Sequence, residues 1–193
     1  MVTNLLFMSL LGILFIQCSI DRTIIPINKA ELKLLKEFQQ LDSVHSIQIS
    51  SEDEPGQKLW LCLTMVSKNG KAPLMNQKVH LYHTSNNGDY EPADLNDEST
   101  ARLNGFAITD AMGRIFVQTI LPGDYGSSSD NRHIHTTVED AIPEAYDINF
   151  KQYTGLLGKN FIKGSDQHFI ANLKQTKNNT LVVILTMEIK KAQ

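Results

Sequence analysis

Residues 58–71 read KLWLCLTMVSKNGK, an apolar run of strand length that ends in an Asn-Gly turn signal. Further short strand candidates are HSIQIS (45–50), KVHLYHT (78–84), GRIFVQTI (113–120), HIHTTV (133–138), YDINF (146–150) and NNTLVVILTMEIK (178–190). Polar segments separate them, and short strands joined by polar turns are typical of a β-sandwich. We therefore predict one sandwich domain over residues 45–193.

The segment before the strands has a different period. Residues 28–41, NKAELKLLKEFQQL, place Leu32, Leu35 and Phe38 at helical spacing. Asn28 can cap this helix, with Glu31 at the capping-box position. The predicted fold class is thus all-β, a prealbumin-like or immunoglobulin-like β-sandwich with a short N-terminal helix, and residues 19–44 supply a linker and that helix.

The first 18 residues form a separate apolar segment. Leu5 to Cys18 is shorter than the ~20 residues that a membrane span needs, and it resembles the core of a bacterial secretory signal. FIQCS resembles a lipobox, which predicts lipidation of Cys18, export, and a membrane-anchored lipoprotein in the periplasm or at the cell surface. A plain N-terminal anchor helix is the alternative. Cys62 would then remain as a buried, inert thiol.

Composition limits the classes of partner. The chain has 193 residues, a formal net charge of -3 and no basic run. That length fits one domain with a tail, and the charge pattern argues against nucleic acid as a partner. Contact with a membrane is expected only through the N-terminal segment.

Four side chains suggest a metal site. His133 and His135 are two residues apart, so on a strand they point to the same face. Tyr90 and Tyr125 each follow a predicted strand, and loops at one end of a sandwich can bring all four together. A tyrosine has an ordinary pKa of about 10, so two phenolates with two imidazoles favour Fe³⁺ over Zn²⁺. The alternatives are surface histidines, a turn-packing Tyr125 and an exposed Tyr90.

The segments KVHLYHTSNNGDYEP (78–92), ARLNGFAITDAMGRIFVQTILPGDYG (101–126) and RHIHTTV (132–138) together resemble the intradiol ring-cleavage dioxygenases, the family of catechol and protocatechuate dioxygenases. The resemblance implies a non-haem Fe³⁺ cofactor with Tyr90, Tyr125, His133 and His135 as its ligands. The implied reaction opens a small aromatic diol between its two hydroxyl-bearing carbons with O₂. Tyr125 would leave the iron and take up a substrate proton.

Two positions depart from the family pattern. The usual arginine three residues before His133 is Asp130 here, and Arg132, next to His133, is the remaining candidate for a catalytic cation. A usual pocket glutamine is replaced by Asp147. Both changes place negative charge near the expected site, so two other functions stay open. One is a non-catalytic prealbumin-like binding module at the cell surface, and the other is a hydrolytic metal site.

Overall fold

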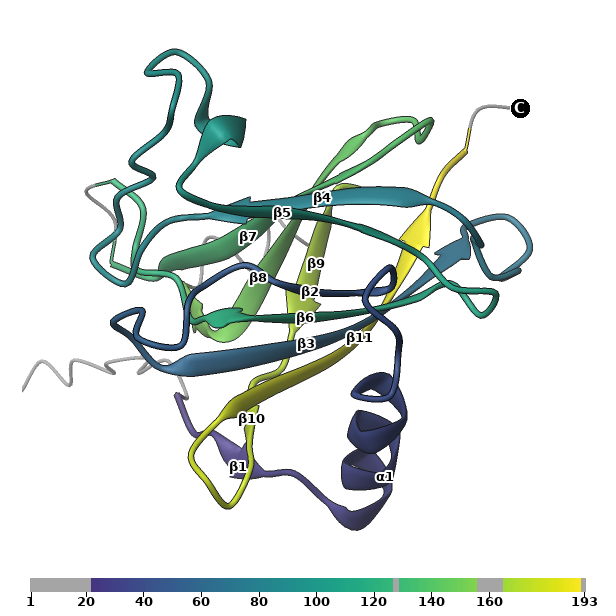
Figure 1. Ribbon diagram of the computed structural model, residues 1–193, viewed down its shortest axis with the longest axis horizontal. Helices are drawn as coiled ribbons and strands as arrows, with labels where there is room; N and C mark the ends of the chain where they lie inside the picture. Colours follow the sequence, from purple (N-terminus) through teal and green to yellow (C-terminus); the bar gives the residue numbers. More distant parts are fainter. Residues whose placement is uncertain (1–21, 127–128, 156–164, 192–193) are drawn as a thin grey trace, which may run out of the picture.

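The computed structural model describes residues 22–126, 129–155 and 165–191 of the chain. Two β-sheets lie face to face (Figure 1), which confirms the predicted β-sandwich. The N-terminal apolar segment with Cys18 lies outside the described residues. Within the described residues, no helix has the length and apolar character needed to cross a membrane.

The two sheets have six and five strands. The first has the order β1 (Ile25–Pro26), β10 (Lys174–Gln175), β11 (Leu181–Ile189), β3 (Lys58–Ser67), β6 (Arg114–Ile120) and β2 (Ser46–Gln48). The second has the order β5 (Leu103–Ile108), β4 (Lys78–His83), β7 (Asn131–Val138), β8 (Ala145–Thr154) and β9 (His168–Ala171). A short 3₁₀ helix, η1 (Glu98–Thr100), lies in the long connection between β4 and β5.

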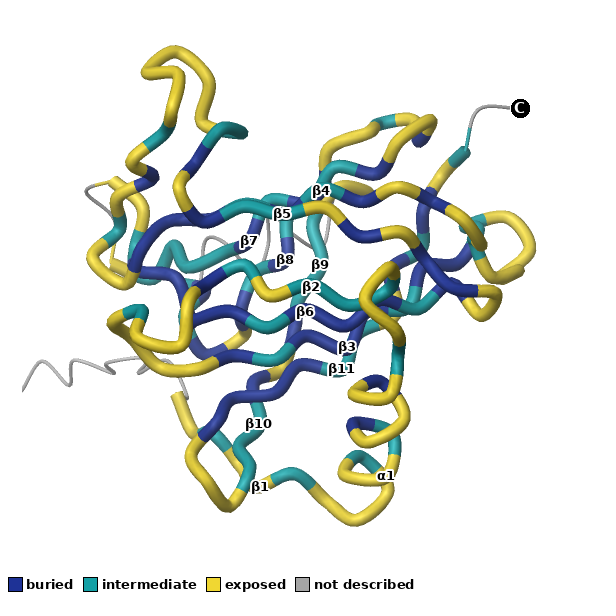
Figure 2. Tube along the Cα trace, viewed as in Figure 1, coloured by how far each residue is buried: buried dark blue, intermediate teal, exposed yellow. Residues whose placement is uncertain are grey.

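The core lies between the facing sheets, where the alternation of each strand puts its apolar side chains. In β3, Leu59, Leu61 and Leu63 are fully buried against residues such as Leu81 and Ile134 from the second sheet. Figure 2 shows buried positions along both facing layers. Because β3 also pairs with β11 and β6, it lies in the interior of its sheet.

The predicted helix is α1 (Lys29–Phe38), and both bonds of its capping box are formed. The Asn28 side chain accepts from the Glu31 amide, and the Glu31 carboxylate accepts from the Asn28 amide, each at 3.0 Å. The apolar stripe of α1 packs on the outer face of the first sheet, through Leu35, Phe38, Cys62, Phe116 and Val182. Burial there raises the pKa of Cys62 to about 12, so this thiol is unreactive.

Four strands lie outside the predicted set: β1, β5, β9 and β10. Strand β1 falls in the segment expected to be a linker, and it pairs with β10 at the edge of the first sheet. Strand β5 contains Asn104 and Gly105, which are poor strand formers. Its pairing with β4 outweighs that weak local preference.

His83 connects the two sheets inside the core. It is fully buried, its Nδ1 donates to the Thr84 carbonyl at 2.7 Å, and its Nε2 accepts from the Thr119 hydroxyl at 2.7 Å. The side chain therefore serves packing and does not line a binding pocket. Burial lowers the pKa of His83 from 6.5 to about 4.

We expect His83 to make the metal-free protein acid-sensitive. The unfolded chain binds a proton near pH 6.5 and the folded chain only near pH 4, so stability is full above pH 6.5 and falls as the pH drops toward 4. The full shift corresponds to about 3 kcal/mol, of which about 2 kcal/mol is lost by pH 5. Urea unfolding at pH 7.5 and 5 measures this loss. His83→Gln should flatten the dependence and the surface variant His45→Gln should not; equal slopes in all three proteins would contradict the assignment.

Candidate metal centre

The two histidines of β7 lie on the outward face of the second sheet. Ile134 and Thr136 of the same strand are buried in the core, so His133 and His135 point the other way. Their Nε2 atoms are 3.1 Å apart. Two ligand atoms that share one metal at about 2.1 Å each are separated by about 3 Å. The spacing therefore suits adjacent ligands of a single ion.

The Nδ1 atom of each imidazole faces a hydrogen-bond acceptor, so the proton of each neutral ring lies on Nδ1. His133 Nδ1 donates to the Asn131 carbonyl at 3.0 Å, and His135 Nδ1 donates to Asp147 Oδ1 at 2.7 Å. In the neutral rings both Nε2 atoms are therefore lone-pair donors. Two lone pairs facing each other at 3.1 Å repel unless a cation or a proton lies between them. This arrangement fits a metal centre.

Tyr90 provides the next donor atom of the cluster. It is buried, and its hydroxyl donates to His135 Nε2 at 2.7 Å. Burial, and secondarily the charge of Glu98, raise the pKa of Tyr90 well above 10. The phenol is thus neutral in the metal-free protein, and only a strongly Lewis-acidic ion would remove its proton at neutral pH.

Tyr125 lies at the open side of the cluster. Its ring centroid is 5.2 Å from that of Tyr90 and 6.3 Å from that of His133. It is 39% exposed, and its hydroxyl donates to Glu98 Oε1 at 2.9 Å. The structure thus brings all four predicted residues together, with the Tyr125 hydroxyl bonded to a carboxylate of η1.

The two tyrosines come from matching Gly-Asp-Tyr segments, 88–90 and 123–125, whose backbones pack against each other. The Gly123 amide donates to the Ser85 carbonyl at 2.8 Å. A Cβ at Gly123 would lie 2.4 Å from the Gly88 nitrogen, and one at Gly88 would lie 2.2 Å from the Asp124 carbonyl oxygen. Gly88 also has a φ of +94°. These glycines allow the approach that sets Tyr90 beside Tyr125, and the repeated motif was a signal available in the sequence.

Asp147 acts behind His135. Besides accepting from His135, its carboxylate lies 3.1 Å from His168 Nδ1. Burial raises the pKa of Asp147, but the hydrogen bond from His135 and the nearby imidazoles outweigh it, so the pKa lies below its ordinary value. The negative charge of Asp147, which the sequence predicts to lie near the expected site, thus orients the candidate ligand His135. Its partner His168 carried no signal in the sequence.

We expect Asp147→Asn to weaken iron binding about 10- to 100-fold, the usual cost of losing such an outer carboxylate. The amide keeps an acceptor for His135 but loses the negative charge that makes Nε2 more basic. Iron titration followed by the visible absorption of the protein measures the change. Asp166→Asn is the matched control, because this carboxylate pairs with Lys68 on the surface. Equal affinities in the two variants would contradict this role.

Arg132 and Asp130 point away from the four residues. The Arg132 guanidinium lies 4.3 Å above the Tyr153 ring, and its Nε donates to Asp124 at 3.3 Å. Asp130 pairs with Arg22 at 2.6 Å. Among the contacts of the described residues, none joins Arg132 to a candidate ligand. A catalytic role for Arg132 stays a prediction that this placement does not favour.

A hollow of about 400 Å³ opens beside the tyrosines. Its lining comes from the β4–β5 connection and from the segment after β6: Asn87, Gly88, Asp89, Tyr90, Pro92, Leu95, Glu98, Asp124, Tyr125 and Gly126. Because both tyrosines line it, a molecule bound there would contact two of the four candidate ligands. Glu98 lies in the first of these segments and carried no signal in the sequence.

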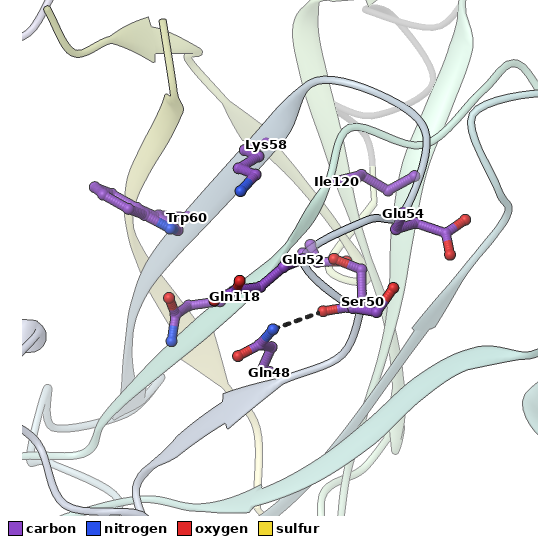
Figure 3. Close-up of a pocket in the computed structure, with 10 residues that line it drawn as sticks. Gln48, Ser50, Glu52, Glu54, Lys58, Trp60, Gln118 and Ile120 are labelled. Atoms are coloured by element: carbon purple, nitrogen blue, oxygen red, sulfur yellow. Dashed lines mark hydrogen bonds between the residues drawn. The ribbon is translucent and has the colours of Figure 1, made fainter. Parts of the chain in front are cut away.

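A second hollow, of about 220 Å³, lies on the other sheet (Figure 3). Its lining includes Gln48 from β2, Lys58 and Trp60 from β3, and Gln118 from β6. The loop between β2 and β3 supplies Glu52. None of the four candidate ligands lines it. Figure 3 shows the hydrogen bond that Gln48 Nε2 donates to the Ser50 backbone carbonyl, at 3.1 Å. This hollow is separate from the metal centre.

Comparison of the sequence with known protein families identifies one match that covers most of the chain. The family described as Dioxygenase matches residues 36–189, which is more than half of the chain. No match was found among curated proteins. The match spans α1 in part and every strand from β2 to β11.

Solved structures share the fold at low sequence identity. An intradiol ring-cleavage dioxygenase from Tetranychus urticae is 20% identical, with a TM-score of 0.59 over 80% of this chain and 90% of that one. The dioxygenase domain of a dioxygenase carbohydrate-binding protein fusion from Streptomyces sp. SirexAA-E is 15% identical, with a TM-score of 0.54 over 79% and 93%. Catechol 1,2-dioxygenase from Pseudomonas arvilla C-1 is 18% identical, with a TM-score of 0.56 over 77% and 57%.

Proposed function

Because this chain belongs to the intradiol ring-cleavage dioxygenase family, we propose that it is a non-haem ferric dioxygenase acting on a catechol-type substrate. The reaction would break the bond between the two hydroxyl-bearing carbons and insert both atoms of O₂, giving a muconate-type diacid. The observation that carries the proposal is the convergence of Tyr90, Tyr125, His133 and His135 at one end of the sandwich.

The four residues form a donor set suited to Fe³⁺. Tyr90 and Tyr125 would supply two negative charges, and His133 and His135 two neutral nitrogens, which leaves little net charge to bury with a trivalent ion. Ferric iron, when bound, would make a chelated catecholate reactive toward O₂. A divalent hydrolytic centre would gain less from phenols whose pKa values are raised.

Other steps, proton uptake and the orientation of the candidate ligands, would depend on the protein's own side chains. Tyr125 borders the hollow and is exposed, so its oxygen would be accessible to a catechol proton. Tyr90 is buried and fixed by its bond to His135. The Tyr82 ring stacks on the His135 ring with centroids 4.7 Å apart, which with Asp147 restricts the orientation of that imidazole.

Visible absorption with iron analysis tests the proposal on the chain that begins after Cys18. Tyrosinate bound to Fe³⁺ gives a broad charge-transfer band, and we expect this band to shift when catechol is added. Tyr125→Phe should change the band and abolish turnover, whereas a substitution in the second hollow, such as Gln118→Ala, should leave both as they are. A protein that stays colourless after ferric loading would instead favour the binding-module function.

We further propose that the protein is exported and anchored through a lipid on Cys18. Support comes from the apolar segment and the FIQCS sequence alone. Mass spectrometry of the protein from membranes of an expressing bacterium should find a diacylglyceryl group on Cys18. Cys18→Ser should release the protein from the membrane fraction, and an unmodified Cys18 would contradict the anchor.

A further inference from the structure

The hollow beside Tyr90 and Tyr125 is acidic. Its lining includes the carboxylates of Asp89, Glu98 and Asp124 and contains no lysine, arginine or histidine. The remaining lining residues are neutral, and Pro92 and Leu95 give it an apolar part, with Leu95 87% exposed. Any ring substituent that extends from the metal centre into this hollow therefore meets a negative potential.

Two of the three carboxylates, those of Asp89 and Glu98, lack a cationic partner among the described residues. Glu98 accepts one hydrogen bond from the neutral Tyr125 hydroxyl, and no described cation pairs with it or with Asp89. Asp124 differs, because it accepts from the backbone amides of residues 130 and 131 and from Arg132. The unbalanced charge of the hollow thus comes from Asp89 and Glu98.

Two arginines near this region, Arg102 and Arg132, are each already paired with a carboxylate. Arg102 binds Glu54, with its Nη1 2.7 Å from Glu54 Oε2, and its Nε also contacts Glu91. Arg132 is held by Asp124 and by the Tyr153 ring. A carboxylate on the substrate would therefore find no free described cation in the hollow.

From this charge pattern we propose that the site selects catechols with a positively charged or neutral ring substituent, such as an aminoalkyl chain, and discriminates against catechols that carry a carboxylate. The inference rests on the proposed dioxygenase function and names its substrate class. The ammonium group would lie near Asp89 and Glu98, with the alkyl carbons against Pro92 and Leu95. At the dielectric of water, one unit charge ~6 Å away changes affinity about threefold, so Asp89 and Glu98 together change it about tenfold.

The test compares three substrates of the iron-loaded enzyme: catechol, catechol with a 4-(2-aminoethyl) group and 3,4-dihydroxybenzoate. At low ionic strength we expect kcat/KM to fall in the order amine, catechol, carboxylate, with about 100-fold between the extremes. Added salt should reduce this ratio, because the hollow is open to solvent. Asp89→Asn should lower the ratio about tenfold, whereas Glu52→Gln, in the second hollow, should leave it unchanged.

The outcomes separate the two proposals. Turnover of catechol without preference for the amine, or a ratio that Asp89→Asn leaves unchanged, overturns the charge selection and leaves the dioxygenase function intact. If turnover is absent, calorimetry can measure the dissociation constants of the same three compounds. The ratio of affinities for the amine and the carboxylate then replaces the ratio of kcat/KM values. Equal affinities then overturn the inference, and no binding of any catechol overturns both proposals.

Discussion

Replacing His135 by alanine is expected to remove iron, the visible band and turnover together. His135 is the centre of the cluster, since its Nε2 meets Tyr90 at 2.7 Å and His133 at 3.1 Å while its Nδ1 binds Asp147. The substitution deletes one candidate ligand and also leaves the half-buried Asp147 without its hydrogen bond from His135. We expect a fall in iron affinity of more than about 100-fold, beyond the usual cost of losing an outer partner, and no measurable ring cleavage.

Thr137→Ala is the matched control for this substitution. Thr137 lies two residues further along β7 and so on the same face, but it lines the region near Lys78 and His80. Iron analysis, the visible spectrum and O₂ uptake should be unchanged in this variant. Circular dichroism should show the β-sandwich intact in both proteins. A His135→Ala protein that binds iron like Thr137→Ala would exclude His135 as a ligand.

Gly123→Ala is expected to lower the rate of ring cleavage strongly, although Gly123 is not one of the four candidate ligands. A Cβ there would lie 2.4 Å from the Gly88 nitrogen and 2.6 Å from the Asn86 carbonyl oxygen, and these are backbone atoms that no side-chain rotation can move aside. The two Gly-Asp-Tyr segments must therefore separate, which shifts Tyr125 relative to Tyr90. A displacement near 1 Å in a catalytic constellation can cost about 100-fold in rate. Overpacking should also cost about 1–3 kcal/mol of unfolding free energy.

The control for this prediction is Gly70→Ala. A Cβ at Gly70 would meet no atom within 4 Å, so only the general effect of the substitution remains. Steady-state kinetics and urea unfolding, measured side by side, distinguish the two variants. If Gly123→Ala matched Gly70→Ala in rate and stability, close packing of the two segments would not be what positions the tyrosines.

Several elements of this fold were predictable from local patterns. The capping box of Asn28 and Glu31 and the apolar spacing of residues 32–38 predicted α1, and the apolar run 58–67 has the bounds of β3. Strands β9 and β10 were missed because they are four and two residues long. Such short segments have too few residues to show a period, and pairing with β8 and β11 stabilises them.

For the site, the sequence alone determined the sandwich, the shared face of His133 and His135, and the set of four candidate ligands. Only the tertiary structure decided how their surroundings act. The contact of Tyr90 with His135 spans 45 residues, and that of Tyr125 with Glu98 spans 27. Strand pairing also turned Asp147 toward His135 and Arg132 toward Tyr153. Local patterns record period and turn chemistry, whereas the partner of each charge depends on which distant segments the two sheets bring together.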